Sequence, residues 1–158
     1  MSRLLLTLAA AVTLLGLVGS ATGGLLGRQT DRYEAQLTPG NEVPPVNSAA
    51  VGQFVGVFNK RTRVFVWVMR FGALSGPATA AHIHVGPKGK SGPVLVPLCA
   101  PCRNPSGGTI LLTPAQAQAF RLHRPLYANI HTARNPAGEI RGQLVVQSDA
   151  GRQGCAPC

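Results

Sequence analysis

The sequence has few charged and few aromatic side chains and many residues that interrupt helices. Of its 158 residues, 13% are charged and 5% aromatic, whereas 19 are glycine and 13 are proline. This composition disfavours a helical bundle, and the abundance of valine among the apolar residues favours many short strands joined by tight turns. We therefore expect one all-β domain, because the length suits a single core of ordinary size.

Acidic residues are scarce. Five acidic residues stand against 15 basic ones, which gives a formal net charge of +10. Such a balance attracts anions, among them small anionic substrates, acidic lipid and acidic polysaccharide. Nucleic acid is not expected as a partner, because the basic residues are scattered, the densest cluster is only Lys60–Arg63, and aromatics for base stacking are few. The simplest interpretation is a basic surface on an exported protein.

The one long apolar run lies at the N-terminus. Residues 1–21 are typical of an export signal, in which Arg3 precedes an apolar stretch over 4–18 and small residues over 19–21. With about 15 residues the stretch is short for a membrane-spanning helix, and an uncleaved anchor is the alternative. No cysteine follows it, which disfavours a lipoprotein. We expect a protein of the periplasm, cell envelope or extracellular space. Its further parts are a flexible lead-in over 22–32, a domain over 33–147 and a tail over 148–158.

Short runs that are valine-rich or alternate in polarity predict the strands. They are Tyr33–Leu37, Val51–Phe58, Arg63–Phe71, Ala80–Val85, Val94–Val96, Leu126–Thr132 and Glu139–Val146. The segment 38–46 cannot pair regularly because its prolines lack a ladder donor, and 99–108 is expected to be a loop. Residues 64–69 are apolar on both faces. This strand is either central and covered on both sides or, as we slightly favour, presents its outer face to a partner or a second copy of the chain.

One short helix is expected in the second half of the domain. Thr113 supplies an N-cap hydroxyl, Pro114 stands at the first helical position, and Gln116 completes a capping box. The helix should span 114–122. It is expected to bury Ala117, Phe120 and Leu122.

Three of the four histidines form a pattern that is typical of a metal site. His82 and His84 project to the same side of an extended strand, about 7 Å apart, while Ile83 faces the other way. His131 lies in a similar run that can pair beside the first. We expect the three imidazoles to converge on one ion, copper rather than zinc, because the Irving–Williams order favours copper. The alternative is that the histidines make ordinary structural hydrogen bonds.

A glycine-rich turn over 86–93 follows the paired histidines. It carries Lys88 and Lys90, which would speed the arrival of an anion at the metal. The turn lacks the glycine-to-lysine spacing of a nucleotide-binding loop, so we do not interpret it as one.

All four cysteines lie in two copies of one tetrapeptide, Cys99–Cys102 and Cys155–Cys158. In a reducing compartment the four thiolates would indicate a zinc site, whereas in an exported protein disulfides are favoured. Each copy can close on itself, or the C-terminal pair can cross to the first. A thioredoxin-like redox role is the least favoured, because no βαβ pattern surrounds either copy.

Several ordered motifs resemble the CHRD domain, named for chordin. They are Leu37–Val46, Ala80–Gly86, Leu112–Thr113 at the start of the helix, Asn129–Thr132 and Gly138–Leu144. The resemblance covers residues 33–146, nearly all of the expected mature chain. CHRD domains are found in animal chordins and in many exported bacterial proteins, so the resemblance implies export.

The same pattern is more distantly similar to the Greek-key sandwich or barrel of copper,zinc superoxide dismutases. In that comparison His82, His84 and His131 match copper ligands. The metal-bridging histidine has no clear counterpart, and His123 is the only remaining candidate. The zinc ligands are missing, so the resemblance implies a copper-only form with superoxide as its anionic substrate.

The guiding arginine of that family is also unmatched. Glu139 stands at its place near the final strand, which leaves Arg134 or Arg141 to guide the anion. The resemblance therefore implies copper binding more strongly than catalysis. We expect an exported copper-binding CHRD protein with copper-only superoxide dismutase activity. The alternatives are a non-catalytic cell-envelope module that binds a protein or polysaccharide, and a copper storage or delivery protein.

Overall fold

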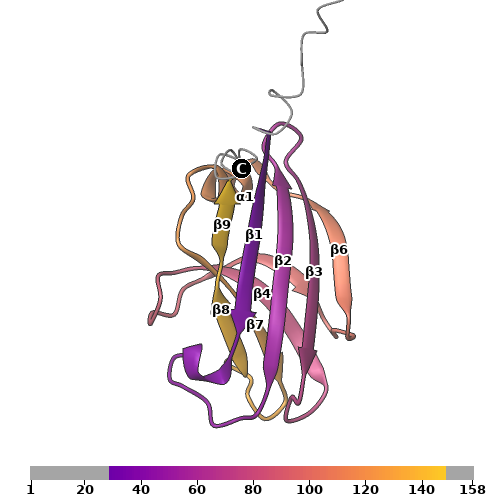
Figure 1. Ribbon diagram of the computed structural model, residues 1–158, viewed down its shortest axis with the longest axis vertical. Coiled ribbons are helices and arrows are strands. Elements are labelled where there is room, and N and C mark those ends of the chain that lie inside the picture. The colour runs from indigo at the N-terminus through magenta and orange to yellow at the C-terminus, as the bar shows by residue number, and fades with distance from the viewer. Residues whose placement is uncertain (1–28, 149–158) are drawn as a thin grey trace, which may run out of the picture.

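The computed structural model describes residues 29–148 and consists of two antiparallel sheets around a common core (Figure 1). The five-stranded sheet has the order β6-β3-β2-β1-β9, and the four-stranded sheet has the order β5-β4-β7-β8. The first is built from β1 (Thr30–Leu37), β2 (Val51–Asn59), β3 (Val64–Gly72), β6 (Ser106–Leu111) and β9 (Val145–Ser148). The second is built from β4 (Ala78–Val85), β5 (Val94–Cys99), β7 (Leu126–Thr132) and β8 (Ile140–Gln143). The helical elements are η3 (Pro39–Asn41) and α1 (Pro114–Arg121). The expected all-β sandwich is confirmed.

Strict alternation of buried and exposed residues gives the five-stranded sheet one inner and one outer face. Phe65 and Trp67 of β3 point into the core, whereas Val66 and Val68 between and after them are 49% and 42% exposed. Their neighbour across the β2–β3 ladder, Val57, is exposed as well. The alternative in which this strand is covered on both sides is therefore wrong within the described residues, and the outer face presents a row of valines to solvent.

Helix α1 begins as the capping box predicts. The Thr113 hydroxyl accepts a hydrogen bond from the Gln116 backbone N–H, and the Gln116 side chain accepts one from the Thr113 N–H. Phe120 is buried and meets Tyr33 edge-to-face, with ring centroids 5.2 Å apart. The expectation that Leu122 is buried is wrong, because it follows the last helical residue as the C-cap and is 62% exposed.

The structure departs from the expected strands in three places. β1 begins at Thr30, inside the expected lead-in. β6 occupies part of the expected loop over 99–108, and its glycines explain why the sequence hides it. A Cβ on Gly107 would stand 3.0 Å from the Trp67 carbonyl oxygen, and one on Gly108 would stand 3.3 Å from the Trp67 indole nitrogen. A side chain at either position would press on Trp67, which would have to give by a few tenths of an ångström, so glycine is the residue that fits here without adjustment.

The third departure is that the final strand divides. Leu144 separates β8, which pairs with β7, from β9, which pairs with β1 in the other sheet. The Leu144 N–H donates to the Leu126 carbonyl, and its side chain stays in the core while the chain crosses from one sheet to the other. One continuous segment thus closes the sandwich along this side.

The outer face of the four-stranded sheet carries polar side chains. In β4, β7 and β8 the residues that face the core are apolar, and those between them face outward. The outward residues are His82, His84, Tyr127, Asn129, His131, Arg141 and Gln143. Loop 86–93 lies over them, since Arg141, Gln143 and His84 all hydrogen-bond its backbone carbonyls. This polar outer face positions the candidate site.

Several expectations fall outside the described residues. The export signal over 1–21, most of the lead-in, and Cys155 and Cys158 lie there. Within residues 29–148, no helix is long and apolar enough to cross a membrane.

Candidate metal centre

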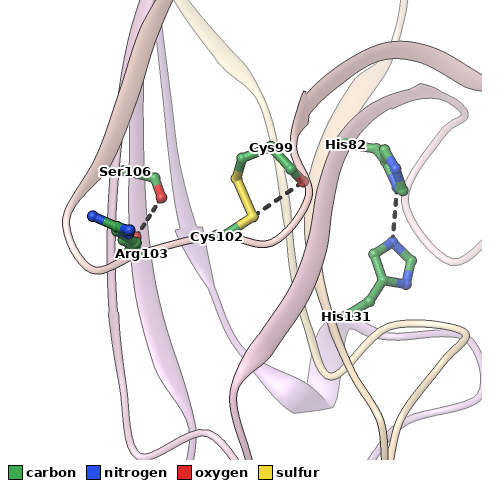
Figure 2. The surroundings of a disulfide bond; sticks show 6 residues. All are labelled: His82, Cys99, Cys102, Arg103, Ser106 and His131. Carbon is green, nitrogen blue, oxygen red and sulfur yellow. Dashed lines mark hydrogen bonds between the residues drawn. A yellow bond between two sulfur atoms is a disulfide. The ribbon is translucent and has the colours of Figure 1, made fainter.

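Antiparallel pairing of β4 with β7 brings the three histidines together. His82 stands opposite Asn129 and Ala80 stands opposite His131, so His131 lies diagonal to His82 on the same face. Figure 2 shows the His82 and His131 rings pointing toward each other, with Nδ1 of His82 3.0 Å from Nε2 of His131. One nitrogen from each of the three rings lies within 4.8 Å of the other two. The sequence-predicted group can therefore hold a metal ion.

Backbone carbonyls orient two of the three rings. The Pro136 carbonyl accepts a hydrogen bond from Nδ1 of His131 at 3.0 Å, and the Gly92 carbonyl accepts one from Nδ1 of His84 at 2.9 Å. A carbonyl only accepts, so each Nδ1 carries the proton, and a neutral ring then presents its lone pair at Nε2. Such carbonyl partners are the usual outer support of a metal-binding histidine.

The protonation of the rings also suits a metal. Burial lowers the pKa of His82 below its ordinary value, and the neighbouring His131 and His84 lower it further. Burial likewise lowers the pKa of His131, against the opposing hydrogen bond to Pro136. Both rings are therefore neutral at neutral pH and keep the lone pairs that a metal needs.

Two residues that sequence reasoning missed contact His84. Tyr127 stacks its ring flat on the His84 imidazole, with centroids 4.7 Å apart and planes 4° apart. The side-chain oxygen of Asn129 lies 3.1 Å from Nε2 of His84. A hydrogen bond at Nε2 occupies the nitrogen that a metal would use, so Asn129 has to turn away before His84 can bind an ion. Their outward positions between apolar core residues of β7 were the signal in the sequence.

Arg141 does not stand beside the histidines as the superoxide dismutase comparison requires. Arg141 is 2% exposed, and its guanidinium carbon lies 3.3 Å from the centre of the Tyr127 ring. Since β7 lies between β4 and β8, Tyr127 separates Arg141 from His84. Arg134 is exposed in the turn after β7. The hypothesis that Arg141 guides an anion directly to the histidines is not supported by this placement.

The structure places His123 in a different cluster. Its Nε2 lies 3.0 Å from one carboxylate oxygen of buried Asp31, and the other oxygen of Asp31 forms an ion pair with Nζ of Lys60 at 2.7 Å. His123 follows the C-terminal end of α1 and does not belong to the group of three histidines. It therefore gives no fourth ligand in this arrangement.

A fully buried carboxylate, Glu139, fixes the turn beneath His131. It accepts hydrogen bonds from the Ser48 hydroxyl, from the backbone N–H and hydroxyl of Ser75, and from the Thr132 hydroxyl, all between 2.6 and 2.8 Å. Burial alone would raise its pKa, but these donors outweigh burial and lower the pKa to about 2. Glu139 thus ties two loops to the end of β7 and is a structural residue.

Glu42 is the second buried carboxyl near the site. It is 7% exposed, and its Oε1 has no hydrogen-bond partner among the described residues. Burial raises its pKa to about 7, against the opposing charge of Arg141 and the backbone N–H of Val43. A Cβ on Gly138 would stand 2.4 Å from this oxygen and 2.9 Å from the Asn129 amide nitrogen, so both side chains pack against Gly138.

A disulfide lies on the strand next to the histidines. Cys99 and Cys102 are bonded to each other, which selects self-closure for this copy of the motif. Cys99 pairs across the ladder with Ala81, the residue before His82, and Figure 2 shows the disulfide beside the His82 strand. A disulfide fits an oxidising compartment.

Comparison with known proteins places the chain in one family. No curated protein and no solved structure matches it, so the likeness to superoxide dismutases stays a prediction. The CHRD domain family model matches residues 33–144, which begin within β1, end just after β8 and include the three histidines. Since this match covers most of the sequence, the chain belongs to the CHRD domain family.

Proposed function

We propose that this CHRD protein is exported and binds one copper ion through His82, His84 and His131. The observation that supports it is the grouping of three imidazole nitrogens within 4.8 Å. Metal–nitrogen bonds of about 2 Å place ligand atoms roughly 3 Å or more from one another, so the three rings would draw closer together on binding an ion. An all-imidazole site of this kind favours copper over zinc by the Irving–Williams order.

Three histidine ligands leave room for a further small ligand. His82 is only half-buried, so the group opens to solvent on its side. A bound copper ion would supply one-electron chemistry between Cu(II) and Cu(I), which is what superoxide dismutation requires. The chain itself holds the ligand rings in their tautomers and carries Lys88 and Lys90 on the covering loop, where positive charge attracts an anion.

The test of copper binding is metal analysis with copper EPR on purified protein. The wild type should bind one copper with nitrogen hyperfine structure, and His82→Ala and His131→Ala should each lose it. His123→Ala is the matched control, since His123 pairs with Asp31. Full copper occupancy in both His82→Ala and His131→Ala would refute the proposal.

A superoxide assay on copper-loaded protein separates catalysis from storage. Copper-dependent dismutation in the wild type that is lost in His131→Ala would establish the enzyme. Tight copper binding without turnover, together with transfer of copper to a chelator, would indicate storage or delivery.

The second candidate function is a non-catalytic module that binds an envelope protein or polysaccharide. The observation in its favour is the exposed apolar outer face of the five-stranded sheet, which includes Val51, Val57, Val66, Val68 and Leu111. A copper-free protein that associates with itself or with envelope polysaccharide, and releases when Val66 and Val68 are replaced by threonine, would support it. A monodisperse monomer without such affinity would count against it.

A further inference from the structure

A cavity lies at the β8 edge of the four-stranded sheet, where β7 separates β8 from β4. Its volume is about 190 Å³, and all the residues that line it are polar: Gln36, Asn41, Lys88, Arg141 and Gln143. Two of these five side chains are cationic and none is acidic. The walls come from β1, the η3 segment, loop 86–93 and β8, which are separate parts of the chain.

Arg141 is the main charge of this cavity. It is 2% exposed, yet its Nη2 donates only to the Pro87 and Lys90 carbonyls, at 3.1 and 2.8 Å. Within residues 29–148, no carboxylate forms an ion pair with it, and its Nε and Nη1 form no hydrogen bond. A buried guanidinium without a counter-ion is unfavourable, and its free donors suit a planar or tetrahedral oxyanion.

The second cation is held close to the first by the fold. The carbonyls that Arg141 binds belong to Pro87, the residue before Lys88, and to Lys90, two residues after it in loop 86–93. Gln143 also fixes this loop, because its amide donates to the Gly86 carbonyl at 2.8 Å. The backbone that carries Lys88 is therefore held in place by hydrogen bonds from two residues of the cavity, Arg141 and Gln143.

We infer that this cavity binds a small oxyanion group, such as phosphate or a carboxylate, between Arg141 and Lys88. The nearest acidic side chain, Glu42, does not line the cavity. Burial raises its pKa to about 7, so below neutral pH it does not oppose an anion. Tyr127 lies between this cavity's arginine and His84, so the oxyanion site is separate from the histidines and does not rest on copper binding.

Calorimetric titration of the metal-free protein at constant ionic strength tests the inference. The probes are inorganic phosphate and glucuronate, the latter standing for the carboxylate of an acidic polysaccharide. The matched variants are Lys88→Glu, which reverses a cavity charge, and Lys90→Glu, which makes the same change in net charge at a residue that does not line the cavity. Neither change touches the buried Arg141 side chain.

We expect saturable binding of at least one probe, weakened about tenfold or more in Lys88→Glu and changed less than about threefold in Lys90→Glu. Phosphate alone would identify a free inorganic anion as the ligand class, and glucuronate that competes with phosphate would identify a sugar carboxylate. His82→Ala should bind both probes as the wild type does. Equal weakening in the two lysine variants, or no saturable binding of either probe at millimolar concentration, would overturn the inference.

Discussion

Glu42 and Glu139 are two buried glutamates that lie near Gly138, and their pKa values are shifted in opposite directions. Glu139 accepts four hydrogen bonds, and its pKa falls to about 2. Glu42 approaches Gly138, the residue before Glu139, with an oxygen that has no partner among the described residues, and its pKa rises to about 7. Burial alone therefore does not decide the charge of a carboxyl, because the supply of donors does.

The contrast separates a carboxylate whose hydrogen bonds are complete from one whose hydrogen bonds are not. Glu139 accepts hydrogen bonds from Ser48, Ser75 and Thr132, and these bonds join two loops to β7. Glu42 retains an unsatisfied oxygen that faces Gly138. Unsatisfied buried polar atoms are rare in folded proteins and are found at functional sites.

The largest expected effect is that of removing the saturated carboxylate. Glu139→Ala strands four donors in the interior and should lower the free energy of unfolding by roughly 3–5 kcal/mol. Urea denaturation at neutral pH measures it. Glu34→Ala, at an exposed glutamate that pairs with Arg32, is the control and should cost less than about 1 kcal/mol. A loss in Glu139→Ala no larger than in the control would contradict the structural role.

Gly138 links the two glutamates and should be the next most sensitive position. Its φ of 137° is one that side chains rarely adopt, and a Cβ there would stand 2.4 Å from Oε1 of Glu42. Gly138→Ala should therefore destabilise the protein by about 2–4 kcal/mol. Adding Glu42→Ala should recover the part due to the collision and leave the backbone strain. Additive losses in the double variant would show that the two residues do not touch.

Neutralising Glu42 should increase the stability of the protein, in contrast to the two changes above. Its raised pKa means that the folded protein resists ionising it, so Glu42→Gln should stabilise the protein by about 1–3 kcal/mol at pH 8 and change little at pH 4. Denaturation at the two pH values measures the difference. If Glu42→Gln instead destabilised the protein at pH 8, the ionised carboxylate would be acting as the counter-ion of Arg141, and the oxyanion cavity would lose its main argument.

The smallest expected effect is on the pH dependence of the free energy of unfolding. Glu139 should make this free energy rise with pH in the acid range, and Glu42 should make it fall as the pH approaches neutrality. Glu139 has a lowered pKa, so its contribution is present above pH 4.5 and is lost as the pH falls toward about 2. Glu42 has a raised pKa, so its contribution is present below pH 4.5 and is lost as the pH rises toward about 7. Each slope is at most about 1.4 kcal/mol per pH unit. Glu139→Gln should flatten only the acid limb, and Glu42→Gln only the limb toward neutrality.

The sequence predicted the parts of the site that depend on local pattern. The alternation around Ile83 placed both histidines of β4 on one face, and the capping box placed α1 at Pro114. It did not predict the division of the last strand at Leu144, because that depends on which sheet each half meets.

The roles of the two glutamates were also beyond the sequence. The donors of Glu139 come from residues 7, 64 and 91 positions away. A local pattern cannot show such partners, nor can it show that Glu42 lacks them. The sequence suggested that Arg141 acts beside the histidines. The structure instead places Arg141 against the Tyr127 ring and in the lining of a separate cavity.

The crossing of the chain from β8 to β9 lies near the end of the domain, so it is synthesised after the strands that carry the histidines. The strands that carry the three histidines, β4 and β7, are complete before residue 140 has been made. The edge that joins the two sheets, and the arginine of the oxyanion cavity, belong to the segment that follows. A chain that ends at residue 139 would therefore carry all three histidines, but its β1 would lack the β9 neighbour and residues 140–148 would not yet join the two sheets.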